Sequence, residues 1–276
     1  MVVVGGITRL TRSGLSIVEW APIMGTLPPL SEAAWQQAFA KYQRFPEYQQ
    51  VNVGMSLAEF KSIYFWEYLH RLLGRLIGVA VFVPWVVFLV QRRLPWVLAR
   101  RLPWLLVLGG AQGALGWFMV KSGLKDVPHV SPYRLAAHLG MAFLLLGAVL
   151  WLLFGLIAPR QKAGRLRPAT AAFVGILCLQ VLYGALVAGR HAGMGYNTFP
   201  LMDGHLWPPG IAALAPGWLN LLENNTTVQF IHRGLAWTLA SFALGLFVAS
   251  RTIAVPAELR RRYGLLLAAV ALQFTL

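Results

Sequence analysis

Long apolar runs separated by short basic loops are the feature that most constrains the fold of this chain. A helix needs about 20 apolar residues to cross a bilayer. A soluble core does not require as many hydrophobic residues as this chain has, since 58% are hydrophobic and only 12% are charged. The runs therefore predict an all-α polytopic membrane protein. The spans are expected at residues 63–90, 104–120, 135–157, 170–189, 227–249 and 263–276.

The apolar runs at the two ends of the chain are shorter than a span. The opening "MVVVGGI" resembles the last turns of a further helix, and the run 263–276 stops before it has crossed a bilayer. We expect both terminal helices to be incomplete.

The distribution of basic residues predicts the topology. The net charge is +15, but the basic residues punctuate apolar runs, which favours a role in topology over a nucleic-acid partner. The positive-inside rule places short basic loops in the cytoplasm or, in a mitochondrion, the matrix. These loops are 91–103, 158–168 and 250–264. Each contains four Lys or Arg, and the three together contain a single acid, Glu258. The longer linkers 8–62, 121–134 and 190–226 contain acids as well as bases and are expected outside.

Two smaller features of the chain bear on its environment. The segment "SEAAWQQAFAKYQRF" (31–45) is amphipathic and predicts an interfacial helix. Cys178 is the one cysteine and lies in an apolar run, so an intramolecular disulfide is excluded and an inert, packed thiol is expected.

The sequence also contains an internal repeat. "EYLHRLLG" (67–74) resembles "QFIHRGLA" (229–236), and the segment 7–29 resembles 186–209. "AQGAL" (111–115) similarly resembles "LQFTL" (272–276). The repeat predicts two tandem, pseudo-symmetric four-helix halves, residues 1–157 and 170–276. The complete protein would have eight helices, of which about seven are expected here.

Three histidines lie near the outer ends of predicted spans: His70, His138 and His232. An ionisable group inside a span costs a few kcal/mol, so it is a functional candidate by default. The matched depth and the two repeated His-Arg pairs favour a functional role over satisfied core or interfacial histidines.

The residues that follow two of these histidines extend the pattern. Small residues occupy the positions four and eight after each histidine: Gly74 and Gly78 after His70, and Ala236 and Ala240 after His232. Such stripes usually allow close helix packing. They also leave a groove in which a flat macrocycle can lie against an axial imidazole. Two histidines from facing helices would then hold one haem iron in each half.

Charged residues flank these histidines. Arg71, Arg75 and Arg233 are candidates to pair with haem propionates, or alternatively to reach the lipid headgroups. Glu67 lies three positions before His70 on the same face, and its counterpart in the second half is Gln229, which does not ionise. This asymmetry predicts that only the first half carries acid–base chemistry. The alternative is a helix-surface ion pair between Glu67 and Arg71.

At these residues the chain resembles the haem A synthase family of bacterial and mitochondrial inner membranes. The matching pieces are "GGITRLTRSGLSIVEWAPIMGTLPPL", "EYLHRLLGR", "AAHLGMAFLLL", "GRHAGMGYNTFPLMDG" and "FIHRGLAWTLA". They span nearly the whole chain. The absence of a cysteine pair in the outer loops makes the chain similar to the cysteine-free, long-loop type of the family.

The resemblance implies an oxidoreductase of haem A biosynthesis, needed for cytochrome oxidase assembly. Its halves would hold a substrate haem O and a haem b, and the C8 methyl group of haem O would become a formyl group by successive hydroxylations. Glu67 would be catalytic, and His70 and His138 would ligate the substrate haem iron. His232 would ligate the haem b iron, and the repeat spacing places its partner ligand beyond the C-terminus.

The resemblance also implies a location and partners. A bacterial inner membrane is expected, or the mitochondrial one in a eukaryote. The implied partners are haem O synthase and an electron-transfer protein, while self-association stays open.

Two other readings of the same residues stay open. A di-haem b electron-transfer protein would have the same histidines, but electron carriage alone does not need Glu67. A transporter built from repeats would favour helices interrupted at the midplane, whereas the polar groups here gather near one face. The loop histidines His129, His191 and His205 are weaker candidates for any site.

Overall fold

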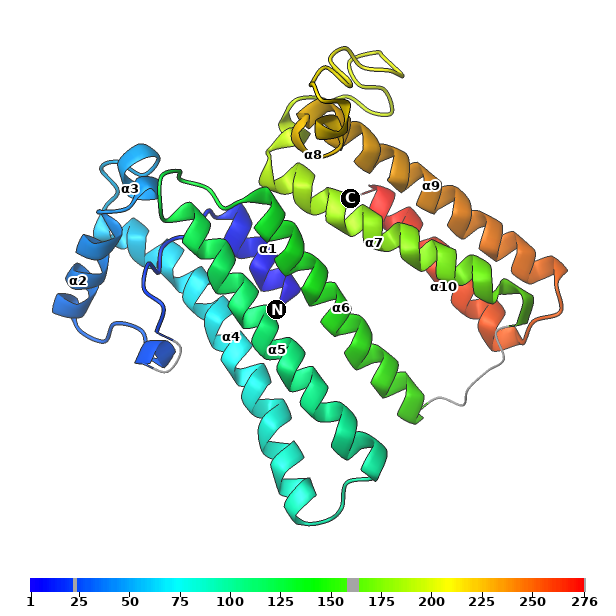
Figure 1. Cartoon of the computed structure of the whole chain (residues 1–276), viewed down its shortest axis with the longest axis horizontal. Coiled ribbons are helices and arrows are strands. Elements are labelled where there is room, and N and C mark those ends of the chain that lie inside the picture. Colours follow the sequence, from blue (N-terminus) through cyan, green and yellow to red (C-terminus); the bar gives the residue numbers. More distant parts are fainter. Residues whose placement is uncertain (22–23, 158–163, 276) are drawn as a thin grey trace. The chain divides into compact units, whose positions relative to one another are not determined.

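The computed structural model describes residues 1–21, 24–157 and 164–275, and it confirms the all-helical prediction there (Figure 1). The α-helices are α1 (Val2–Leu10), α2 (Glu32–Tyr42), α3 (Pro46–Gln50), α4 (Leu57–Val90), α5 (Trp96–Gly123), α6 (Pro132–Ile157), α7 (Arg167–Gly189), α8 (Asn220–Glu223), α9 (Asn225–Thr252) and α10 (Ala257–Thr275). Short 3₁₀ turns cover Met24–Thr26, Gly164–Leu166, Ala192–Met194 and Gly217–Leu219.

Five helices in the described ranges are long and apolar enough to cross a membrane: α4, α5, α6, α7 and α9. Large apolar side chains on them are exposed, including Val79, Val107 and Trp151. A soluble monomer rarely leaves so much apolar surface uncovered. Lipid is therefore the natural cover of these faces, and the predicted polytopic membrane protein is confirmed.

Helix α4 begins six residues before the predicted span. Ser56 caps it: its hydroxyl accepts a hydrogen bond from the Glu59 backbone, and the Glu59 carboxylate accepts one from the Ser56 backbone N–H at 2.8 Å. This capping box fixes the start of the helix in the loop.

The predicted basic loop 91–103 is mostly helical, which corrects its boundary. Helix α5 starts at Trp96 after Pro95 and continues through Pro103. A proline inside a helix removes one backbone hydrogen bond and usually marks a boundary. Here the helix passes it, so Arg100 and Arg101 belong to α5. Residues 158–163 of the second basic loop lie outside the described residues.

Residues 263–275 of the predicted last span belong to the longer helix α10 (Ala257–Thr275), which is not among the five candidate spans of the described residues, and residue 276 lies outside those residues. The first turns of α10 contain Arg260, Arg261 and Arg262. Two other predictions concern short helices. The interfacial segment 31–45 contains the helix α2, capped by Ser31, and residues 2–10 form α1.

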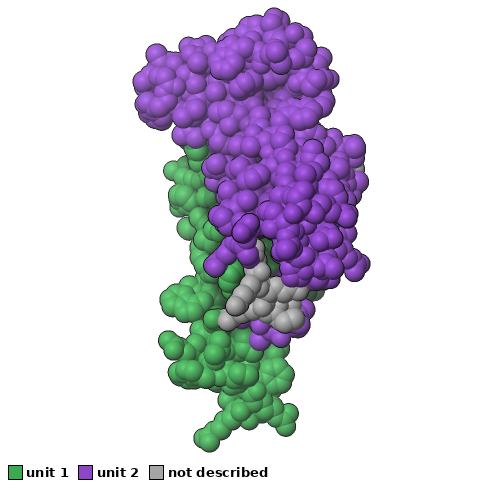
Figure 2. Space-filling view, turned by 90° about the vertical axis from the view of Figure 1, so that its right-hand side faces the viewer, with its two compact units in different colours: residues 1–151 green, residues 152–276 purple. Residues whose placement is uncertain are grey.

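The chain divides into two compact units, Met1–Trp151 and Leu152–Leu276 (Figure 2). In the first unit, α4 packs against α1, α2 and α5. An aromatic cluster around Phe60 joins α2 to the start of α4, and its members are Trp35, Phe39, Tyr42 and Tyr64. The helices α2 and α3 thus sit at the N-terminal end of α4 (Figure 1).

In the second unit, α9 packs between α7 and α10. Its core consists of Leu166, Phe173, Leu239, Ala243, Leu246 and Tyr263. The loop from residue 190 to 219 lies at the C-terminal end of α7 and the N-terminal end of α9 (Figure 1). Cys178 on α7 is exposed, so the expectation of a packed thiol was wrong. Cys178 lies on the surface of a helix that is apolar enough to cross a membrane, and in such a helix an apolar neighbourhood in the sequence does not imply burial in protein.

Candidate functional site: three half-buried imidazoles and two arginine-bound loops

His70 lies on α4 with the N–C–N edge of its ring against α1. A Cβ atom placed on Gly5 would be 3.0 Å from His70 Cε1, 3.6 Å from Nδ1 and 3.7 Å from Nε2. The helices approach so closely because Gly5 has no side chain. The imidazole is therefore held at the interface of α1 and α4.

His138 on α6 makes the same kind of contact with α5. A Cβ atom on Gly116 would lie 2.9 Å from His138 Cε1. One turn away, Gln112 donates a hydrogen bond from Nε2 to the backbone carbonyl of His138 at 3.0 Å. His70 and His138 both lie in the first unit, and their assignment to one haem iron stays a prediction.

His232 repeats the arrangement in the second unit. It lies on α9, and a Cβ atom on Gly184 of α7 would be 3.1 Å from its Cε1. Gln180, one turn before Gly184, has its Nε2 3.5 Å from His232 Nε2, which is too long for a strong hydrogen bond.

The Nδ1 atoms of all three histidines are buried and have no hydrogen-bond partner among the residues that the structure describes. Unpaired buried polar atoms are rare in proteins and ask for an explanation. Half-buried imidazoles whose Nδ1 atoms are buried and unpaired fit ligation of a haem iron. The donor set therefore fits the haem groups that the sequence predicted.

Glu67 is 3% exposed and carries three well-formed hydrogen bonds. Its Oε2 accepts from the Ser16 hydroxyl and from the Ile17 backbone N–H, both at 2.7 Å, and its Oε1 accepts from Arg71 Nη2 at 2.6 Å. The pair with Arg71 was the alternative reading of Glu67. Because the carboxylate is buried and also binds the loop, the pair is not the weak helix-surface type.

The two arginines of the first half also bind this loop. Arg71 donates to the carbonyls of Ile17 at 2.9 Å and Glu19 at 3.2 Å. Arg75 donates to the carbonyl of Ala21 at 3.2 Å. Their predicted pairing with propionates stays a prediction, and the contacts give both residues a second role in fixing the loop after α1.

In the second unit, an arginine binds the backbone of the loop after α7 in the same way. Arg233 donates to the carbonyls of Tyr196 at 2.8 Å and Thr198 at 2.6 Å. In the aligned repeats these carbonyls correspond to those that Arg71 binds. Gln229, the counterpart of Glu67, donates its amide to the Tyr196 carbonyl at 2.9 Å. Both halves therefore contain an arginine that binds the loop backbone. They differ at the neighbouring position, which is Glu67 in the first half and Gln229 in the second.

The backbone after α1 and α7 shows the same correspondence. Arg12 and His191, each two residues beyond the end of its helix, have left-handed φ angles of 52° and 54°. A non-glycine residue rarely adopts such an angle. The shared exception supports the register of the repeat.

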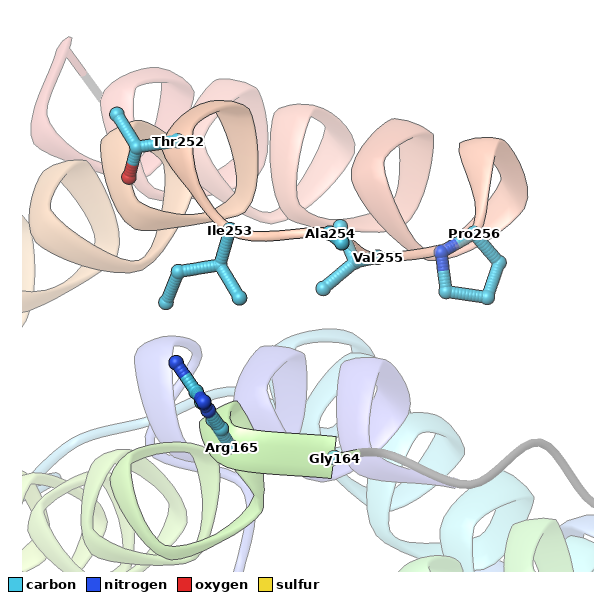
Figure 3. Close-up of a pocket in the computed structure, with 7 residues that line it drawn as sticks. All are labelled: Gly164, Arg165, Thr252, Ile253, Ala254, Val255 and Pro256. Atoms are coloured by element: carbon cyan, nitrogen blue, oxygen red, sulfur yellow. The ribbon is translucent and has the colours of Figure 1, made fainter.

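Four residues next to the predicted histidines and Glu67 were not predicted from the sequence. They are Ser16, Gly5, Gly116 and Gly184. A usable signal existed for two of them, since the alignment of 7–29 with 186–209, extended by two residues, pairs Gly5 with Gly184. A separate hollow lined by Gly164, Arg165 and residues 252–256 (Figure 3) contains none of the predicted site residues.

Fold and site together define a polytopic helical membrane protein in which half-buried imidazoles and arginines that bind a loop backbone recur in two halves. The chain belongs to the family of cytochrome oxidase assembly proteins (COX15-CtaA), whose family model matches residues 1–276.

Curated relatives in this family are named Heme A synthase. The protein from Nitrosospira multiformis is 49% identical, and the match covers 100% of this chain and 79% of the relative. The one from Rhodospirillum centenum is 54% identical over 89% of this chain and 67% of the relative. The one from Parvibaculum lavamentivorans is 52% identical over 93% and 75%. No solved structure matches the chain.

Proposed function

We propose that this protein is a multi-pass enzyme of the bacterial inner membrane that oxidises haem O to haem A. The membership of the family and the names of the relatives support this function. The observation that carries the proposal is the pair of equivalent histidine sites that differ in one group, Glu67 against Gln229. A di-haem electron carrier does not require that difference, and the relatives do not favour it.

The first unit is the proposed substrate half. His70 and His138 bind the iron of haem O and orient the ring, with α1 and α5 packed against the two imidazoles. The methyl group would be oxidised in two steps, each of which replaces one C–H bond by a C–OH bond and removes two electrons from the carbon. Water, with the electron-transfer partner as acceptor, or dioxygen, with that partner as electron donor, would balance each step. The first product is an alcohol, and the second is a hydrate that loses water to form the aldehyde.

Glu67 handles the proton in this proposal. Its carboxylate is buried, and the hydroxyl of Ser16 is bound to it at 2.7 Å, so a proton has a short path between the two groups. Arg71 keeps the carboxylate in place from the other side. Gln229 has no exchangeable acid proton, which restricts this role to the first half.

The second unit is the proposed cofactor half. His232 would hold the iron of haem b, and Arg233, which binds the Tyr196 carbonyl of the loop after α7, would be the partner for a propionate. When bound, haem b supplies one-electron redox chemistry to the protein. Haem O synthase as the source of substrate and an electron-transfer protein are the proposed partners.

Expression of the full-length protein in cells that make haem O tests the function. Pigments extracted from the membranes are separated by chromatography. We expect haem A in cells with the protein and only haem O and haem b in cells without it. Cells that contain the protein and haem O but make no haem A would contradict the proposal.

A further inference from the structure

Three glycines on three helices make one and the same contact in this protein. Gly5 on α1, Gly116 on α5 and Gly184 on α7 each face the Cε1 atom of a histidine on a neighbouring helix. The Cβ that any other residue would add comes within 2.9 to 3.1 Å of that atom. Carbon atoms that are not bonded pack at about 3.5 to 4.0 Å.

Glycines inside the same helices that do not face an imidazole lack such a contact, whereas a Cβ atom on Gly123, the last residue of α5, would come as close to another group, at 2.9 Å from the Leu15 side chain. A Cβ atom on Gly6 of α1, Gly113 of α5 or Gly175 of α7 would meet nothing within 4 Å. Close packing of helices in general therefore does not account for the contacts. Inside the helices, before their last residue, the close contacts occur at the positions that face an imidazole.

We infer that Gly5, Gly116 and Gly184 are positioning residues that fix the three imidazoles by direct contact. The inference rests on the proposed function, since it concerns histidines that ligate haem iron.

The unpartnered Nδ1 atoms explain why a steric contact is needed. Histidines that bind a metal usually donate Nδ1–H to a carboxylate or carbonyl, and this bond orients the ring. The Nδ1 atoms of His70, His138 and His232 have no such partner among the described residues. The glycine contact takes the place of the missing hydrogen bond.

The geometry of the contact gives it influence over ligation. Cε1 is the ring atom between the two nitrogens, so pushing it also moves Nε2. An alanine would force the ring back by several tenths of an ångström, or would separate the helices. Either change misplaces a ligand whose bond to iron requires a defined distance and direction.

The contact recurs at equivalent places in the repeat. Gly5 faces His70 in the first half as Gly184 faces His232 in the second. Alanine at Gly184 should therefore disturb only the haem b half, and alanine at Gly5 or Gly116 only the substrate half.

Gly184→Ala and its matched control Gly175→Ala on the same helix provide the test. The purified proteins are compared in haem b content per chain, in the low-spin absorption and electron paramagnetic resonance spectra, and in thermal melting. Loss of an orienting contact of this kind typically weakens binding of the metal group by about 10- to 100-fold. We expect at least a tenfold loss of bound haem b, or a shift to a high-spin spectrum, in Gly184→Ala. Gly175→Ala should match the wild type.

A Gly184→Ala protein that inserts, melts normally and has the wild-type spectrum and haem content would overturn the inference. The proposed function would stand in that case if the wild type makes haem A, whereas a wild type without haem A contradicts the function itself. If Gly184→Ala is not recovered from membranes, Gly5→Ala against Gly6→Ala gives the same test on the low-spin spectrum of bound haem O. A wild-type spectrum there would overturn the inference equally.

Discussion

Glu67 and Gln229 differ by one functional group, yet they hold equivalent loops in different ways. Glu67 accepts the Ile17 N–H, while Gln229 donates to the carbonyl of Tyr196. The fold therefore tolerates an amide at this position if the loop backbone presents a carbonyl to it. In the first half the loop presents donors, from Ser16 and Ile17, which suit a carboxylate.

Glu67→Gln should lower the rate of haem A formation by about 100-fold or more, because general acid–base groups contribute about that much. The haem b content should stay at the wild-type level, since the second half is unchanged. Chromatography of extracted haems measures both quantities. Wild-type haem A from Glu67→Gln would reduce Glu67 to an anchor for the loop.

Ser16→Ala separates the chemical role of Glu67 from its role in holding the loop. The change removes one of three hydrogen bonds to the carboxylate and should cost about 1 kcal/mol of stability. Haem A formation should slow less than in Glu67→Gln, because Ile17 and Arg71 still hold the group. Ser13→Ala is the control, since the Ser13 hydroxyl bonds to Thr11 and not to Glu67. Equal loss of activity in Ser16→Ala and Glu67→Gln would show that loop closure, not the acid, limits turnover.

At the scale of elements, α2 and α3 form an aromatic cap on the start of α4 with a buried acid inside it. Glu47 on α3 is 5% exposed and accepts a hydrogen bond from the Tyr42 hydroxyl at 3.1 Å. Asn52 donates to the same hydroxyl at 2.7 Å. Burial raises the pKa of Glu47 from 4.5 to about 7, with the charge of Glu67 adding to the rise and Arg12 opposing it.

This pKa predicts a pH-dependent stability. The folded state keeps the Glu47 proton over a range in which the unfolded chain has already lost it. Stability should therefore fall as pH rises from about 4.5 to about 7 and then level off. Glu47→Gln should remove this part of the slope and melt higher than the wild type at pH 8. Thermal melting in detergent across this range checks it, and an unchanged slope in Glu47→Gln would contradict the assignment.

The sequence predicts those parts of the site that depend on residues close together in the chain, and it misses the contacts between residues far apart in the chain. The histidines, Glu67 and the repeat are predictable because they follow from local patterns and helical spacing. Glycine contacts such as Gly116 with His138 join separate helices, and nothing near Gly116 in the sequence indicates its partner. Helix α5 begins at Trp96, eight residues before the predicted span 104–120, and it continues through Pro103. The prediction missed this start because Arg100 and Arg101 lie within the helix although they interrupt the apolar run.

At the scale of the whole molecule, the predicted topology stays a prediction. Single cysteines at Gln91 and Leu206, in a chain with Cys178 replaced by serine, test it with a membrane-impermeant maleimide on intact cells. Leu206 is exposed in the loop between α7 and α9, and Gln91 directly follows the last residue of α4 in the basic loop. We expect labelling of Leu206→Cys and none of Gln91→Cys before the cells are opened. The reverse pattern would invert the orientation.

The central claim is a division of labour between two equivalent halves, one for substrate and one for a resident haem. Pigment analysis of purified full-length His70→Ala and His232→Ala proteins tests it most directly. We expect His70→Ala to keep haem b but to lack haem O and haem A, and His232→Ala to lose haem b. Loss of haem b from His70→Ala together with its retention in His232→Ala would contradict the account.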